Sequence, residues 1–152
     1  HLDVADTEAF AELEGQFDTV ICLNVLEHVE RAEQAVQNIA HALRPGGKAI
    51  VLVPQGAWLF SSLDRVLGHV KRYGRPDLTE VMEASGLELL ELRDFNRVGV
   101  FGWFLNGPVL RRESFSKVQL KVLNTAIPAV SKLDPHFPWH GLSLIAVARK
   151  RA

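Results

Sequence analysis

The distribution of hydrophobic and polar positions along the chain predicts alternating strands and helices. Residues 19–23, 49–53 and 142–148 are almost continuously apolar, and residues 87–92 form a further apolar stretch. Continuous apolar runs of this length are typical of strands that are buried on both faces. These four segments therefore predict a sheet that is covered on both sides.

The segments between the strands carry apolar residues at alternating spacings of three and four, which predict amphipathic helices. The first helical series, residues 29–43, ends at Pro45-Gly46-Gly47, which stops a helix. Two more helices are expected, from about residue 58 to 69 and from Pro76 to Gly86. Strand, helix and strand in this order make a right-handed βαβ unit. We therefore expect an α/β fold, a mostly parallel sheet with helices on both faces.

A long connection, residues 95–141, separates the last two predicted strands. It contains an aromatic cluster, Phe95, Phe101, Trp103 and Phe104, and an amphipathic segment with Leu120, Leu123, Ile127 and Val130 on one face. Connections of this length usually carry structure of their own and often a function. We expect an insertion that serves as a lid, a substrate-binding region or a subunit interface.

Composition and charge exclude several classes of protein. The chain has 152 residues, a normal globular composition, and 17 basic against 18 acidic residues. It lacks the basic surface that binding to a nucleic acid requires. The single cysteine, Cys22, lies in an apolar run and suits a reducing compartment. With no signal peptide and no run of eighteen apolar residues, we expect a cytoplasmic protein without stable membrane insertion.

Several motifs resemble those of class I S-adenosylmethionine (SAM)-dependent methyltransferases. They are LDV at residues 2–4, FDTVICLNVLEHV at 17–29, LRPGGKAIVLVP at 43–54, GHVKRYGRPDLTEVMEASGLEL at 68–89 and the late strand SLIAVARK. The resemblance covers nearly the whole chain and implies a Rossmann-like sheet with an antiparallel late strand. It also implies SAM as cofactor and methyl transfer to a hydroxyl, amine or carboxylate of a small molecule.

The sequence departs from this family at its start. Members carry a glycine-rich loop under the methionine part of the cofactor and an acid that holds the ribose hydroxyls, and neither is present here. Glycines allow close backbone approach, and an acid binds hydroxyls. We therefore expect a domain that lacks its N-terminal part, with an upstream segment in the same protein.

The resemblance also implies roles for individual residues. Asp3 and Val4 would contact the adenine, and Asn24 and Val25 would lie beside the methionine moiety. His28 and His69 are candidate catalytic bases, since imidazole titrates near neutral pH. A continuing helix would place His69, Arg72 and Tyr73 on one face, where Arg72 and Tyr73 would bind substrate. Trp103 is a further candidate for the substrate pocket.

Simpler interpretations exist for several of these residues. Asn24 suits a helix cap, Asp3 suits a turn, and Glu27 is expected to complement a helix dipole. The six histidines show no metal-ligand spacing, so no metal site is expected. One alternative function is a non-catalytic binding module that forms a homodimer. A nicotinamide-dependent oxidoreductase is a weaker alternative, because the LNVLEHV and LRPGG motifs have no place there.

Overall fold

The computed structural model describes residues 3–119, 121–122, 125–126, 132 and 134–151. The predicted apolar face of the long connection, Leu120, Leu123, Ile127 and Val130, lies outside these residues. The main elements are α1 (Thr7–Phe10), β1 (Phe17–Leu23), α2 (Ala32–Ala42), β2 (Leu43–Pro54), α3 (Ser62–Val66), α4 (Arg75–Ala84), β3 (Leu87–Phe95), α5 (Gly99–Phe104) and β4 (Ser143–Lys150). Short helical turns are η1 (Ala11–Leu13), η2 (Leu26–His28), η3 (Ala57–Leu59), η4 (Leu105–Val109) and η5 (Asp134–His136).

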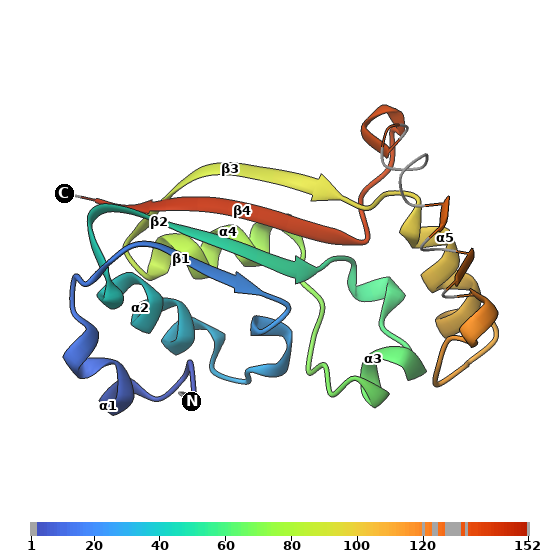
Figure 1. Ribbon diagram of the computed structural model, residues 1–152, viewed down its shortest axis with the longest axis horizontal. Helices are drawn as coiled ribbons and strands as arrows, with labels where there is room; N and C mark the ends of the chain where they lie inside the picture. The colour runs from blue at the N-terminus through green and yellow to red at the C-terminus, as the bar shows by residue number, and fades with distance from the viewer. Residues whose placement is uncertain (1–2, 120, 123–124, 127–131, 133, 152) are drawn as a thin grey trace.

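The strands form one sheet in the order β1-β2-β4-β3 (Figure 1). β1 and β2 are parallel, whereas β4 pairs antiparallel with both β2 and β3. The predicted antiparallel late strand is confirmed. The prediction of a mostly parallel sheet is wrong, because only β1 and β2 pair in parallel. β4 lies between β2 and β3, which run in the same direction, and pairs antiparallel with both.

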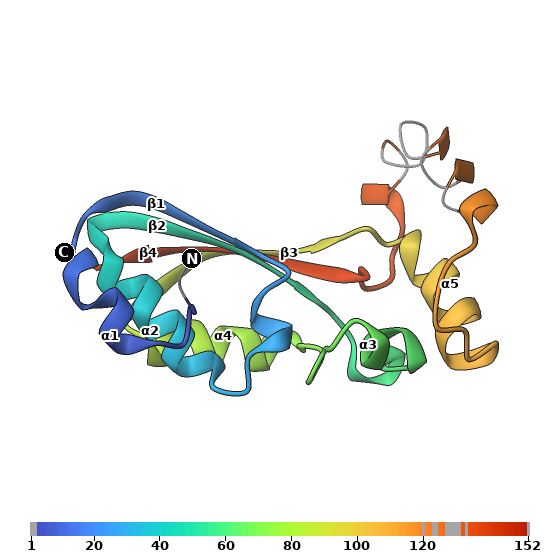
Figure 2. The same cartoon turned by 60° about the horizontal axis from the view of Figure 1, so that its bottom comes forward.

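The helices α1, α2 and α4 lie on the same face of the sheet (Figure 2). The core between this face and the helices contains Val36 and Ile39 of α2, Val51 of β2 and Met82 of α4. Among the described residues no helix covers the opposite face, so the prediction of helices on both faces is wrong there. The apolar runs place side chains on both sides of the sheet, and the outward residues of β1 remain exposed.

The helix expected over residues 58–69 is divided in two. The backbone N–H and the hydroxyl of Ser61 both donate to the carboxylate of Asp64, which starts α3 afresh after the turn η3. Gly68 has a φ of +76°, a left-handed conformation that ends the helical path.

His69, Arg72 and Tyr73 consequently do not share a helix face, contrary to the prediction. The segment that contains them runs along the end of β2, where the N–H of Tyr73 donates to the carbonyl of Pro54 over 2.9 Å. The N–H of Val70 donates to the carbonyl of Glu27 over 2.7 Å. These bonds hold residues 69–73 beside the carboxyl ends of both parallel strands.

The connection between β3 and β4 projects beyond the sheet at the end where β1 and β2 stop (Figure 1). It contains α5 and the π-helical turn η4. Asp94, at the end of β3, holds the two ends of this connection together, because its carboxylate accepts from the N–H of Gly141 over 2.9 Å. The same carboxylate also accepts from Arg75 of α4 over 3.0 Å. In the part of the chain described, no helix has the length and hydropathy needed to cross a membrane.

Candidate functional site

A pocket of about 340 Å³ opens at the carboxyl ends of β1 and β2. Ligands of open α/β sheets bind at such ends. Its lining residues come from both strand ends, the 67–72 segment, α5 and the start of β4: Asn24, Glu27, His28, Pro54, Leu67, His69, Arg72, Trp103, Leu142 and Ser143. The fold therefore assembles this site from segments far apart in the sequence.

Asn24 ends β1 with a sharp bend. Its φ is +52°, and its N–H still donates to the carbonyl of Leu52 over 2.9 Å. Asparagine adopts this left-handed conformation more readily than most residues. The bend leads the chain into η2 and leaves the Asn24 side chain exposed at the pocket.

Glu27 is a buried carboxylate at the base of the histidine pair. Its relative exposure is 1%, and neither carboxylate oxygen has a hydrogen-bond partner among the described residues. Burial raises the pKa of Glu27, while its own backbone N–H and then the nearby His69, His28 and Arg72 act in the opposite direction. The two imidazole rings lie edge to face with centroids 4.9 Å apart.

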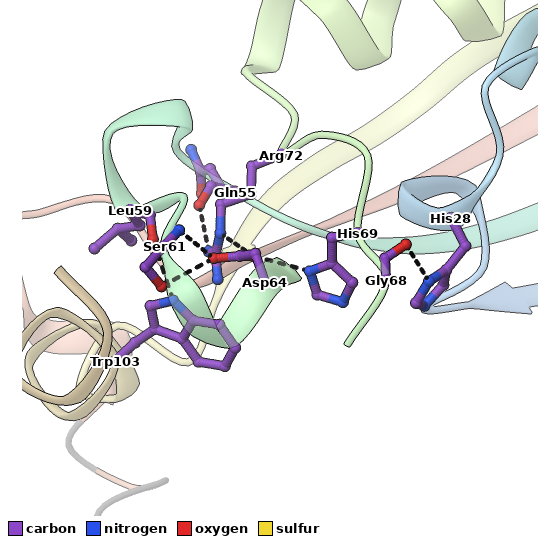
Figure 3. A network of polar contacts seen from close by, with 9 residues as sticks. All are labelled: His28, Gln55, Leu59, Ser61, Asp64, Gly68, His69, Arg72 and Trp103. Carbon is purple, nitrogen blue, oxygen red and sulfur yellow. Dashed lines mark hydrogen bonds and ion pairs between the residues drawn. The ribbon is translucent and has the colours of Figure 1, made fainter. Parts of the chain in front are cut away.

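The hydrogen bonds of the two rings identify their protons (Figure 3). Nδ1 of His28 lies 3.1 Å from the carbonyl oxygen of Gly68, and Nδ1 of His69 lies 2.8 Å from a carboxylate oxygen of Asp64. Both partners are acceptors, so Nδ1 is the donor in each ring. In the neutral imidazoles, Nε2 therefore carries the lone pair.

Asp64 is the centre of a buried network (Figure 3). Besides His69, it accepts from Nε of Arg72 over 2.7 Å and from the N–H of Ser61 over 2.9 Å. Arg72 also donates to the carbonyl of Gln55, and its guanidinium stacks on the Trp103 ring at 4.5 Å. Burial lowers the pKa of Arg72, and the Asp64 carboxylate opposes this. The charge of Arg72 is therefore already paired within the protein.

The structure brings together five of the residues expected to form the site. Asn24, His28, His69, Arg72 and Trp103 all line the pocket. The Trp103 ring N–H donates to the carbonyl of Leu59 over 3.2 Å, which fixes the indole against the end of the segment before α3.

The other expected residues do not line this pocket. Tyr73 is fully buried, and its hydroxyl donates to the carbonyl of Leu26 over 3.0 Å. The carboxylate of Asp3 accepts from the N–H of Ala5, and the carbonyl of Val4 accepts from the amide of Asn38. Val25 is partly buried and packs against the core.

Sequence reasoning missed Asp64 and gave Glu27 only a helix-dipole role. The Ser61-x-x-Asp64 spacing is a recognisable helix-start pattern and could have located the carboxylate. Nothing in that pattern links Asp64 to Arg72 and His69, because the connection depends on the turn at Gly68.

Comparisons with known proteins agree on one family. The sequence profile of a family described as "Methyltransferase domain" matches residues 1–92. A ubiquinone biosynthesis O-methyltransferase of Rickettsia typhi is 31% identical over an alignment of 97 positions, which covers 54% of this chain and 39% of that protein. The chain thus spans about two fifths of the length of this relative.

Solved structures show the same fold. The [4+2]-cyclase SpnF superposes with a TM-score of 0.60 at 20% identity, covering 99% of this chain and 54% of the cyclase. A SAM-dependent methyltransferase of Mesorhizobium loti gives a TM-score of 0.57 at 15% identity, and the superposition covers 90% of this chain and 64% of the Mesorhizobium chain. At these identities the likeness concerns the fold alone, and one fold can host different reactions.

Proposed function

Because the chain belongs to the methyltransferase domain family, we propose that it forms the acceptor side of a site that transfers a methyl group from SAM to a hydroxyl of a small molecule. The observation that carries this proposal is the pair His28 and His69, whose free ring nitrogens lie at the pocket. The name of the Rickettsia relative supports oxygen as the acceptor atom. Amines and carboxylates are the other acceptors to be tested.

The residues present fit one side of a SAM site. Asn24, with its left-handed bend and exposed side chain, and the neighbouring Val25 would lie beside the methionine moiety, and Asp3 with Val4 would contact the adenine. SAM supplies a methyl group already activated on a sulfonium. The chain's own task is then to orient the acceptor and take up its proton.

The acceptor proton is assigned to the histidine pair. A neutral imidazole with a free Nε2 can accept a proton from a hydroxyl within hydrogen-bond reach. The Asp64 carboxylate orients the His69 ring, and the Gly68 carbonyl orients the His28 ring. His28 is exposed at the mouth, whereas His69 lies deeper.

Trp103 and Arg72 would shape the substrate wall of the pocket. The Trp103 ring, stacked on the buried Arg72 guanidinium, would give a flat surface of the kind that suits a ring-shaped acceptor. Tyr73 would act through the Leu26 carbonyl that it holds, which lies next to Glu27. The connection over residues 95–141 would cover the pocket as a lid, since Trp103 comes from it.

We assign the rest of the cofactor site to a segment upstream of His1 in the same protein. The outer edge of β1 has no partner strand in the described chain, and Ile21 and Leu23 are 62% and 50% exposed. Such an edge and such a face normally require a cover. The cysteine Cys22 is buried and free, which suits the cytoplasmic location that belongs to this proposal.

The test is transfer of labelled methyl from SAM to a panel of phenols, amines and carboxylates, by the 152-residue chain and by a form extended upstream. Replacing His28 or His69 by alanine should lower kcat about 10²- to 10⁴-fold, as expected for loss of a general base. His140→Ala is the matched control, because its side chain is 76% exposed and outside the pocket. Unchanged turnover in both pocket variants would refute the role of the histidines.

A second candidate is a non-catalytic assembly module, favoured by the exposed apolar face of β1. This function predicts association that depends on protein concentration and no heat of SAM binding by either form. Sedimentation and calorimetric titration of SAM therefore separate the two functions.

A further inference from the structure

The fold brings one carboxylate and two imidazoles together at the floor and mouth of the pocket. Glu27 and His28 lie in η2, and His69 follows α3. One potential ligand atom from each of the three side chains lies within 4.8 Å of the others. Only His69 is distant in sequence from the adjacent Glu27 and His28, and this distance conceals the arrangement from an analysis of residue spacing.

Glu27 lacks the partners that a buried carboxylate requires. Its side chain is almost completely inaccessible, and both oxygens are without a hydrogen bond among the described residues. Burial of an unpaired ionised group is costly, and such groups in proteins are paired or coordinate metals. The nearest cation, Arg72, is already bonded to Asp64 and to the Gln55 carbonyl.

The two imidazoles are oriented as metal ligands are. Metal-binding histidines generally donate their second ring N–H to a carboxylate or a backbone carbonyl, which fixes the tautomer and the ring. His69 makes the first kind of bond, to Asp64 over 2.8 Å, and His28 makes the second, to Gly68 over 3.1 Å. Asp64 is itself held by Arg72 and Ser61.

From this geometry we propose that Glu27, His28 and His69 bind one divalent transition-metal ion whose open positions face the pocket. One carboxylate oxygen and two imidazole nitrogens suit Zn²⁺, Mn²⁺, Fe²⁺ or Co²⁺, whereas Mg²⁺ and Ca²⁺ prefer all-oxygen sites. Bonds of about 2.1 Å place ligand atoms about 3 to 3.5 Å apart, so the exposed His28 ring moves inward on binding.

A bound ion would also coordinate the methyl acceptor directly. This part of the proposal rests on the proposed function. An acceptor hydroxyl on the open coordination position loses its proton to water more readily. Its oxygen then forms the bond to the methyl carbon as the sulfur–carbon bond of SAM breaks, and S-adenosylhomocysteine leaves. Without the ion, the imidazoles take the proton as proposed above; with the ion bound, their Nε2 lone pairs would hold the metal instead and water would take the proton.

The binding test is calorimetric titration of ZnCl₂ and MnCl₂ into the 152-residue chain, together with the visible absorption spectrum of the Co²⁺ form. We expect one ion per chain and d–d bands of a site with nitrogen and oxygen ligands. Glu27→Gln and His28→Ala should each weaken binding at least about tenfold, since each removes a ligand. His140→Ala should leave binding unchanged.

Folding is checked by thermal unfolding of the same variants. Zn²⁺ should raise the Tm of the parent chain and not that of Glu27→Gln, because only a bound ion stabilises the native state. No ion bound, or equal binding in Glu27→Gln and the parent, would overturn the site. Ion binding without methyl transfer would reject the proposed function alone, and methyl transfer that survives chelation would reject the metal alone.

Discussion

Asp64 shows how much of this site depends on one residue. It is fully buried and accepts hydrogen bonds from an imidazole, a guanidinium and the Ser61 backbone. It thereby fixes His69 toward the pocket and Arg72 against Trp103. A residue that does not itself line the pocket thus determines the position of two that do.

Replacement of Asp64 by asparagine should lower the free energy of unfolding by about 3 kcal/mol, because it leaves Arg72 buried without its counter-charge. Urea denaturation at neutral pH measures this. Arg44→Ala is the control, because its ion pair with Asp18 is exposed and should contribute less than about 1 kcal/mol. A loss in Asp64→Asn no larger than in Arg44→Ala would contradict the assigned importance of the buried pair.

The site was predictable from sequence only in part. Asn24 and His28 follow a recognisable strand directly, so their position at its carboxyl end could be inferred. His69 lines the pocket as expected, but the continuing helix that was the reason for this expectation is absent, because α3 ends at Val66. Tyr73, expected on the same helix face, is buried. Local periodicity does not report the turn at Gly68 or the bridge to β2, which are tertiary features.

Among the elements, strands were predicted better than the helices between them. The four apolar stretches correspond to β1, β2, β3 and β4, because hydrophobic runs record burial directly. The prediction of one helix over residues 58–69 is wrong. The helical spacing of apolar residues continues past Ser61, but the Asp64 carboxylate accepts from the Ser61 N–H and a separate helix begins at that point. The prediction that helices cover both faces of the sheet is also wrong for the described residues. The sequence of a strand shows that its side chains are apolar, but it does not show which element covers them.

Asp94 joins three elements, β3, α4 and the start of β4. Burial alone would raise the pKa of Asp94, but the Gly141 N–H, Arg75, His140 and Arg97 together lower it below the ordinary 3.8. A carboxyl with a lowered native pKa stabilises the fold above its unfolded pKa and loses that effect as the pH falls through the native value.

Asp94→Asn should therefore lower stability by about 1–3 kcal/mol at pH 7, since it weakens charge-assisted bonds. The gap between the parent and the variant should close as the pH falls below 3.8. Urea titrations across this range check the trend, with Glu91→Gln as a surface control whose ion pair is exposed. A gap independent of pH would show that the charge of Asp94 is not the cause.

At the scale of the molecule, the described residues cover one face of the sheet and leave the other uncovered. The helices α1, α2 and α4 shield the first face (Figure 2). Ile21 and Leu23 of β1 are exposed and, two residues apart in a strand, share the other face. An exposed apolar surface next to an unpaired strand edge favours association with another protein segment.

The double variant Ile21→Thr, Leu23→Thr should reduce self-association of the 152-residue chain without unfolding it, since threonine keeps a high strand propensity. Sedimentation velocity over a range of concentrations measures this. Val118→Thr is the matched control, because Val118 is 71% exposed but lies in the long connection. Identical sedimentation of the double variant and the parent would show that this face does not mediate contacts.

The central position of β4 has a consequence for folding during synthesis on the ribosome. Arg149 of β4 pairs with Lys48 of β2 on one side and with Glu88 of β3 on the other, so a strand that is synthesised after both of them fills the gap between them. Until it emerges, β2 and β3 each present an unsatisfied edge. Such long-range pairing slows folding, and the nascent chain therefore has the greatest need of chaperones between the emergence of β3 and that of β4.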